Sequence, residues 1–171
     1  KLESAGSLQW PCNDEAPDGT PTMHVDGFAG LRGGKGRFLI TQYVPTDEKT
    51  GRRFPLLLTT GRVLSQYNVG AQTRRTENTV WHGEDVLEMH PTDAENRGLK
   101  DGDFARLASR SGETTLRVVV TDKVAPGVVY TTFHHPSTQA NVVTTDNSDW
   151  ATNCPEYKVT AVQVTPSNGP S

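Results

Sequence analysis

The chain has few cysteines, few aromatic residues and no long apolar run. Its two cysteines, Cys12 and Cys154, cannot by themselves form a zinc or an iron–sulfur site, and they favour a reduced, cytoplasmic protein over one held by a disulfide. No run approaches the roughly 20 apolar residues of a membrane-spanning helix, and the first residues lack the apolar centre of a secretion signal. The chain begins with a lysine, from which we expect a segment of a longer protein.

An excess of charge of one sign is also lacking. The formal net charge is -3, and acidic and basic residues are interspersed, which argues against a nucleic-acid-binding chain with a basic face. Two or three arginines would still suffice to bind a small phosphorylated ligand. Hydrophobic residues make up only 33% of the chain, whereas glycine and proline number 16 and 11. This composition predicts one loop-rich domain with a true core.

Two regions differ in their pattern. Residues 1–35 are rich in proline and glycine and have little periodicity, so we expect an arm or linker from a preceding domain. Residues 36–171 are expected to form the folded domain. Its expected strands cover residues 38–44, 56–58, 86–89, 104–108, 114–120, 128–133 and 157–164.

Turn and helix signals complete the expected fold. Gly112 lies between two strand-like runs and indicates a hairpin turn. Pro91 suits a first helical position and Gly98 a helix end, which predicts a helix of about two turns over residues 91–97. Six to eight strands with one or two short helices predict a mainly β protein that forms a closed or partly closed β-barrel.

Residues 57–76, LLTTGRVLSQYNVGAQTRRT, carry the first candidate site. An apolar strand ends at Thr60, and Gly61 then permits a positive φ or a close backbone approach. Arg62 follows, and the stretch ends in two further arginines. Backbone N–H groups beside glycine, threonine hydroxyls and arginine forks are suited to bind phosphate or a pterin ring. The alternative is a surface loop whose arginines are solvated.

Residues 133–147, FHHPSTQANVVTTDN, form the second candidate. His134 and His135 are metal-binding residue types, but adjacent residues of a strand point to opposite faces, and no carboxylate or thiol partner is obvious. We therefore expect no metal site. Asn141 offers both a donor and an acceptor to the edge of a heterocycle.

Residues 153–158, NCPEYK, form the third candidate, directly before the last strand. Glu156 or Lys158 would pair with a ligand or with each other. The chain contains neither a GxSxG elbow nor a Walker phosphate loop, and no set of residues is typical of a nucleophile with its base. We expect no catalytic residue in this chain.

Five motifs follow one another along the chain. They are LQWPC at 8–12, GKGRF at 34–38, TTGR, YN and QTRR between 59 and 75, HPTDA, RGL and DGD between 90 and 103, and AN, T and PEYK between 140 and 158. In this order they resemble the last domain of formate dehydrogenase large subunits, in the dimethyl sulfoxide reductase superfamily of molybdoenzymes. Two departures are that Gln72 stands where methionine is common, and that His134-His135 is not a fixed pair in the family.

The resemblance implies the double-psi β-barrel of a molybdopterin-dinucleotide-binding domain. It implies a bis-molybdopterin guanine dinucleotide cofactor that holds molybdenum or tungsten. The turn from Thr60 to Arg62 would approach the pterin or the pyrophosphate. Four later residues, His134, Asn141, Tyr157 and Lys158, would reach the pterin or guanine from the other side. The residues that it assigns to cofactor binding are Thr60, Gly61, Arg62, Gln66, Tyr67, Gln72, Thr73, Asp93, His134, Asn141, Tyr157 and Lys158.

The resemblance further implies a parent formate dehydrogenase that oxidises formate to CO2 and passes electrons toward NAD+. The metal ligand, the catalytic residues, the 4Fe-4S clusters and a flavin would lie elsewhere in that enzyme, so this chain alone is expected to be inactive. The expected partners are the remaining domains of the same large subunit and other formate dehydrogenase subunits. Hydride and electron chemistry belong to the cofactor, and the protein binds and orients it.

Two alternatives stay open. The equivalent domain of an assimilatory nitrate reductase shares these motifs and differs in residues upstream. A free-standing double-psi barrel that acts as an interaction module would share only the fold, because fold does not fix function. The positions of Arg62, Asn141 and Lys158 distinguish a cofactor domain from such a module. If the three side chains face one groove, a cofactor domain is favoured; if they are scattered, the module is favoured.

Overall fold

The computed structural model describes residues 2–25, 27–28 and 34–169, and it divides the chain into two compact units, residues 1–44 and 45–171. The division falls later than the predicted boundary at residue 35. No helix among the described residues is long and apolar enough to cross a membrane.

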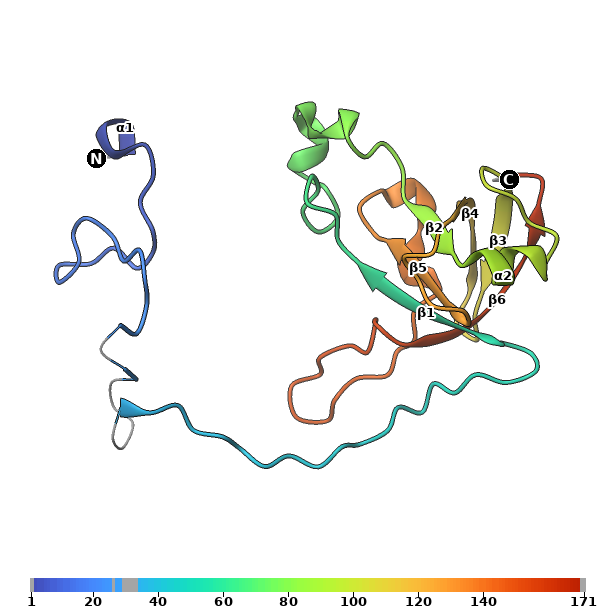
Figure 1. The fold of residues 1–171 in the computed structure, drawn as a ribbon, viewed down its shortest axis with the longest axis horizontal. Helices are drawn as coiled ribbons and strands as arrows, with labels where there is room; N and C mark the ends of the chain where they lie inside the picture. Colours follow the sequence, from blue (N-terminus) through green and yellow to red (C-terminus); the bar gives the residue numbers. More distant parts are fainter. Residues whose placement is uncertain (1, 26, 29–33, 170–171) are drawn as a thin grey trace. The chain divides into compact units, whose positions relative to one another are not determined.

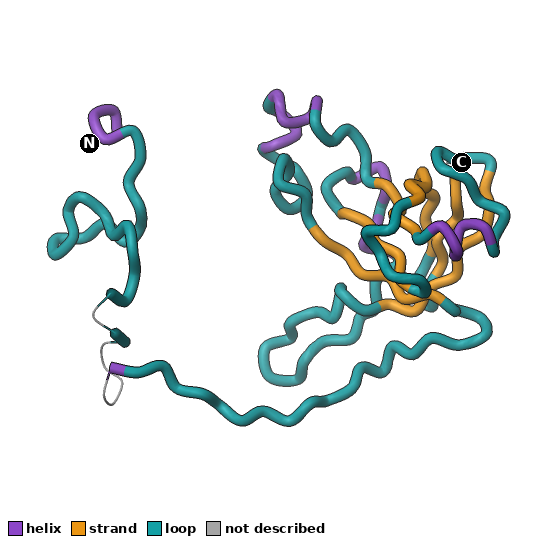
Figure 2. The backbone as a smooth tube through the Cα atoms, in the orientation of Figure 1, coloured by secondary structure: helices purple, strands orange, loops and turns teal. Residues whose placement is uncertain are grey.

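The described part of the first unit is mostly loop and includes a short helix, α1 (Leu2–Ala5) (Figure 2). A small loop is closed at Thr20, whose N–H donates to the Gln9 carbonyl over 2.9 Å and whose hydroxyl donates to the Pro11 carbonyl over 2.7 Å. Residues 38–44 have no regular secondary structure, and most of their apolar side chains are exposed. The strand predicted there is wrong, because β-forming side chains need a partner strand and the described part of the chain supplies none.

The second unit contains a closed barrel of six strands (Figure 1), which confirms the mainly β barrel. Around the barrel the order is β1-β5-β2-β4-β3-β6. The strands are β1 (Leu56–Gly61), β2 (Val86–Met89), β3 (Phe104–Ala108), β4 (Glu113–Val120), β5 (Val128–Thr132) and β6 (Thr160–Ser167). The observed β2 and β3 have the predicted bounds, and the predicted hairpin joins β3 to β4. The last strand begins at Thr160 rather than Tyr157.

The strand directions bring three loops together. β1 is parallel to β5, with Leu57 beside Val128 and Gly61 beside Thr132. β6 is antiparallel to β1, so its first residue, Thr160, lies beside Leu58. The residues that follow β1, those that follow β5 and those that precede β6 therefore meet at one end of the barrel. We call this the loop end and define it by residues 60–85 and 133–159.

Short 3-10 helices occupy these loops. They are η2 (Thr73–Arg75), η3 (Glu77–Val80), η4 (Pro136–Thr138) and η5 (Ala140–Val142). The predicted helix is α2 (Pro91–Glu95), which is shorter than expected. His90 caps it, because its Nδ1 accepts the N–H of Thr92 over 3.2 Å. Gly98 leaves the helix region with a φ of +66°, as a helix stop requires.

The barrel interior is filled by side chains that alternate along each strand. In β1 the buried positions include Leu56 and Leu58, and in β6 they include Val162 and Val164. The largest fully buried apolar side chains are Leu56, Leu58, Leu87, Met89, Leu107, Leu116, Val118, Val129, Val143, Val162 and Val164.

Replacing Leu87 by alanine should lower the free energy of unfolding by roughly 2–5 kcal/mol, because the lost methylene groups leave a cavity in a closed core. Urea denaturation measures this change. Leu64→Ala is the matched control, since Leu64 is fully exposed and its loss should change stability by less than about 0.5 kcal/mol. Equal effects of the two substitutions would contradict the packing described above.

Candidate functional site

The loop end gathers all the predicted cofactor-binding residues except Asp93. Thr60 and Gly61 end β1, and the loop that follows carries Arg62 to Thr73. His134 follows β5, and Lys158 precedes β6. Parallel β1 and β5 thus place residues that are far apart in sequence at one edge of the barrel (Figure 1).

Thr60 fastens the segment before β6 to the end of β1. Its hydroxyl donates to the Tyr157 carbonyl over 2.7 Å, and its own carbonyl accepts from the Lys158 ammonium group. The ring of Tyr157 packs edge to face on Phe133, with centroids 6.4 Å apart. Thr60 is buried and Lys158 is exposed, so Thr60 supports the site and Lys158 presents charge at its surface.

Arg62 is held above the same aromatic cluster. Its Nε and Nη2 donate to the Asn68 side-chain oxygen over 2.9 and 2.6 Å, and its guanidinium lies 5.4 Å from the centre of the Phe133 ring. Asn68 is in the left-handed region, with φ of 47°. A guanidinium has five N–H groups, so the exposed Arg62 keeps donors for an anionic ligand.

Gly61 is required for a reason other than the predicted one. It does not adopt a positive φ, so that part of the prediction is wrong. A Cβ built on Gly61 would lie 2.3 Å from the hydroxyl oxygen and 2.7 Å from a ring carbon of Tyr130. The close approach is to the chain's own tyrosine in the neighbouring strand β5. Glycine therefore allows the two strand ends to pack.

Gln66 has an unfilled hydrogen-bonding group. The residue is 4% exposed, and its Oε1 accepts from the Thr73 hydroxyl over 2.6 Å. The Thr73 oxygen in turn accepts the N–H of Tyr67 over 3.1 Å. In the described part of the chain, no group accepts from the Gln66 Nε2. A buried unpaired donor costs about 1–3 kcal/mol, so this donor calls for an acceptor from outside the described chain.

His134 is a positioning residue. Its ring is fully buried, its Nε2 accepts the N–H of Val63 over 3.1 Å, and its Nδ1 lies 2.5 Å from the Asn68 carbonyl oxygen. A carbonyl only accepts and a backbone N–H only donates, so the ring is the neutral tautomer with its proton on Nδ1. Both nitrogens are used by the loop of residues 62–70. His134 therefore holds the loop and offers no nitrogen to a ligand.

Asp85 anchors the chain after β5. Its buried carboxylate accepts from the backbone N–H groups of His134 over 3.1 Å and His135 over 2.8 Å, and from the hydroxyls of Thr132 and Thr138. Burial alone would raise the pKa of Asp85, but hydrogen bonds from Thr132, His135 and Thr138 hold it below its ordinary value. The carboxylate is thus ionised at neutral pH.

Asp85 also supplies the carboxylate that sequence reasoning found missing beside the histidines. His135 Nδ1 lies 3.1 Å and His82 Nε2 lies 3.9 Å from the Asp85 Oδ1. Burial lowers the pKa of His82, although attraction to Asp85 opposes this shift. Neither His82 nor Asp85 was among the predicted site residues. Fifty residues separate Asp85 from His135, so no local spacing signals the cluster.

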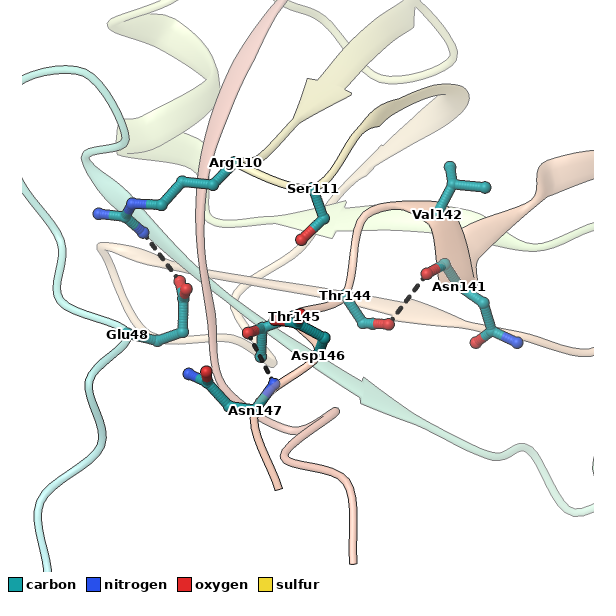
Figure 3. A pocket seen from close by; sticks show the side chains of 9 residues that line it. All are labelled: Glu48, Arg110, Ser111, Asn141, Val142, Thr144, Thr145, Asp146 and Asn147. Atoms are coloured by element: carbon teal, nitrogen blue, oxygen red, sulfur yellow. Dashed lines mark hydrogen bonds and ion pairs between the residues drawn. The ribbon is translucent and has the colours of Figure 1, made fainter. Parts of the chain in front are cut away.

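A polar pocket of about 750 Å³ lies beside the loop end (Figure 3). Asn141, the predicted heterocycle-binding residue, is exposed in its wall, and its carbonyl accepts from the Thr144 hydroxyl over 3.0 Å. Arg110 from the β3–β4 turn pairs with Glu48 over 2.9 Å on another wall. The pocket is lined by Glu48, Arg110, Ser111, Asn141, Val142, Thr144, Thr145, Asp146 and Asn147.

Asp93 lies at the opposite end of the barrel. It is buried in α2, and its carboxylate accepts the N–H of Gly127 over 2.6 Å, directly before β5 begins. Since β5 leads from Gly127 to the loop end over five residues, the two ends are roughly 15 Å apart. The Asp93 carboxylate fastens α2 to the barrel and is not brought together with the other predicted residues.

A family model and curated relatives both match this chain. Residues 56–161 match the family model described as Molydopterin dinucleotide binding domain. The chain is 35% identical over 158 residues to the F420-dependent formate dehydrogenase subunit alpha of Methanocaldococcus jannaschii, covering 92% of this chain and 23% of that protein. It is 30% identical over 169 residues to the assimilatory nitrate reductase catalytic subunit of Bacillus subtilis, covering 97% and 24%.

A solved structure shares the fold. The acetylene hydratase of Pelobacter acetylenicus superposes with a TM-score of 0.56 at 15% identity, over 67% of this chain and 18% of that protein. The chain thus spans about a quarter of the length of the curated relatives named above.

Substitution of Gly61 by alanine should destabilise the barrel by roughly 1–3 kcal/mol, because the new methyl group overpacks against Tyr130. The same substitution in a Tyr130→Ala background should cost less than about 0.5 kcal/mol, since the three heavy atoms nearest to the new methyl group all belong to Tyr130. A double-mutant cycle in urea measures the coupling. Additive effects would show that Tyr130 is not what excludes a side chain at position 61.

Acid should destabilise the protein through Asp85. Its folded-state pKa lies below the ordinary value of 3.8, so the ionised group contributes stability above about pH 4 that is lost as pH falls through the folded pKa. NMR titration of the side-chain carboxyl carbon measures this pKa directly. Thr138→Val removes one hydrogen bond and should raise this pKa, whereas Thr79→Val, whose hydroxyl donates to the Thr76 carbonyl, should leave it unchanged. An unchanged pKa in Thr138→Val would refute the assigned cause.

Proposed function

Because this chain belongs to the Molydopterin dinucleotide binding domain family, we propose that its loop end binds a molybdopterin guanine dinucleotide cofactor. The metal of that cofactor would be molybdenum or tungsten. The cofactor supplies the redox chemistry when bound. The work of this chain is to bind it, orient it and exclude water from it.

The observation that carries the proposal is the unpaired Nε2 of Gln66. This donor is buried at the loop end, beside the turn that holds Arg62. The Thr73 hydroxyl fixes the opposite atom of the amide, so Nε2 stays available for an acceptor. Pterin and guanine rings carry carbonyl and ring-nitrogen acceptors, and such a ligand would satisfy the donor. The residues present therefore fit the cofactor.

The exposed cations suit the anionic part of such a ligand. Arg62 and Lys158 lie on one aromatic cluster, Arg62 over Phe133 and Lys158 within 5.4 Å of the Tyr157 ring centre. We assign the pyrophosphate to these two side chains, because guanidinium and ammonium groups form strong charge-assisted hydrogen bonds with phosphate. Tyr67 and Gln72, both exposed in the same loop, would extend the contact.

Asn141 would form hydrogen bonds with the edge of the pterin or guanine ring. Its amide is exposed in the wall of the polar pocket, where it offers a donor and an acceptor. Thr60, Gly61, Thr73 and His134 are occupied by contacts within the chain, and we assign them to shaping the loop end. Arg62 and Lys158 lie on one aromatic cluster, whereas Asn141 lines a pocket that includes neither of them, so the described pocket does not unite the three. The family match is what favours the cofactor domain over a free-standing interaction module.

The parent enzyme that we propose is a formate dehydrogenase. The 35% identity to the F420-dependent formate dehydrogenase subunit alpha exceeds the 30% identity to the assimilatory nitrate reductase catalytic subunit, which makes nitrate reduction the second candidate. Sequence reasoning expected electrons to pass to NAD+, whereas the relative is named for F420. Assays of the parent enzyme with each acceptor distinguish the two. Its 4Fe-4S clusters, its flavin, its partner subunits and its cytoplasmic location stay predictions.

GDP should bind the full chain as a stand-in for the guanine half of the cofactor. We expect weak, saturable 15N chemical-shift changes grouped around Gly61, Gln66 and Asn141. Arg62→Ala should raise the dissociation constant by about tenfold, as expected for a lost charge-assisted hydrogen bond. Lys123→Ala removes the same charge in the exposed turn before β5 and should leave the constant unchanged. Shift changes grouped around Asp93 instead would overturn the assignment of the loop end.

A further inference from the structure

One cluster at the loop end is unused by the proposed function. His82, Asp85 and His135 each place one nitrogen or oxygen atom so that the three atoms lie within 4.8 Å of one another. They come from two chain segments, the loop that enters β2 and the loop that leaves β5. The Asp85 carboxylate is buried, and the two imidazoles are 19% and 11% exposed, so an ion could enter from solvent.

We propose that His82, Asp85 and His135 form a binding site for a divalent transition-metal ion of the zinc type, separate from the metal of the dinucleotide cofactor. Two imidazoles and one carboxylate are a ligand set that Zn²⁺ accepts in tetrahedral coordination, with water as the fourth ligand. Magnesium and calcium prefer sites built from oxygen atoms, so two imidazole nitrogens select against them.

The distances in the cluster suit such an ion. Ligand atoms bonded at about 2.0–2.2 Å in tetrahedral geometry lie roughly 3.3 Å from one another. The Asp85 Oδ1 lies 3.1 Å from His135 Nδ1 and 3.9 Å from His82 Nε2. The three ligand atoms lie within 4.8 Å of one another, so His82 has to move by roughly 1–2 Å toward Asp85 and His135 to reach tetrahedral spacing. Its place in an irregular segment next to Gly83 permits this movement.

The ion would take the place of a proton. A carboxylate only accepts hydrogen bonds, so the His135 Nδ1 carries a proton when it lies 3.1 Å from the ionised Asp85. Metal binding through Nδ1 requires the other neutral tautomer, in which this proton has moved through solvent to Nε2. The remaining donors to Asp85 are the backbone N–H groups of residues 134 and 135 and the hydroxyls of Thr132 and Thr138, and none of them is a ligand. They orient the carboxylate toward the ion.

The bound ion would join the loops at the adjacent ends of two paired strands, because β2 and β5 are antiparallel neighbours. His82 lies between η3 and β2, and His135 lies between β5 and η4. A bond from each to one ion fixes their separation, so the bound state stabilises the folded loop end. None of the three residues is among those assigned above to the cofactor.

Zinc binding is measured on the full chain without a histidine tag, in a Cys12→Ser/Cys154→Ser background that removes both thiols. Competition with a chromogenic zinc chelator should show one ion per chain. His82→Ala and His135→Ala should each weaken binding by at least about tenfold, because a first ligand is lost. Zinc in excess should raise the Tm by roughly 5 °C in the parent background and not in these variants.

Two controls make the result decisive. His90→Ala removes an imidazole that caps α2 at the other end of the barrel, and it should bind zinc as the parent background does. Far-ultraviolet circular dichroism shows whether each variant is folded; Asp85→Asn is not used, because loss of this anchor disturbs β5. Equal zinc affinity in His82→Ala, His135→Ala and the parent background would overturn the proposal. GDP binding by the same variants should be unaffected, so the metal site and the cofactor proposal fail independently.

Discussion

The loop end depends on one buried carboxylate. Removing Asp85 from water is costly unless its oxygens are hydrogen-bonded, and the chain meets this cost with donors from the end of β5 and the turn after it. These contacts fix where His134 lies, and His134 fixes the loop after β1 through Val63 and Asn68. Asn68 then holds Arg62. A single carboxylate, directly before β2, thus orders the surface where the ligand groups are presented.

Most of the barrel was predictable from local patterns. Apolar runs bounded by turn residues predicted the first and last residues of β2 and β3 correctly. Gly98, predicted to end the helix, has the positive φ typical of a residue at a helix end. The predicted strand at residues 38–44 was wrong because a segment with high β propensity forms a strand only where a partner strand is available. The sequence of the segment itself does not show whether such a partner exists. Glycine at position 61 was rightly singled out, but its cause lies in a tyrosine nearly seventy positions later.

The site could be predicted only in part. Motif resemblance brought together residues that the parallel pairing of β1 and β5 does place at one end, yet it did not separate residues that face a ligand from residues that hold the loop. Gln66 and His134 are both buried polar residues of the loop end, and nothing in the sequence distinguishes their roles. Only the hydrogen-bond inventory separates them, because one has an unpaired donor and the other has both nitrogens engaged. The role of Asp85 was not predicted, because the residues that donate hydrogen bonds to it are distant in the sequence.

The pairing of β1 has a consequence for how the chain is made. Both neighbours of this strand, β5 and β6, are encoded well after it. On a ribosome, the leucines of β1 therefore leave the exit tunnel long before any strand exists that can cover their edges. Unpaired apolar strands are the segments that associate wrongly with other chains. The interval before β6 emerges is thus the period when this domain most needs a chaperone, and non-local closure of this kind is intrinsically slow.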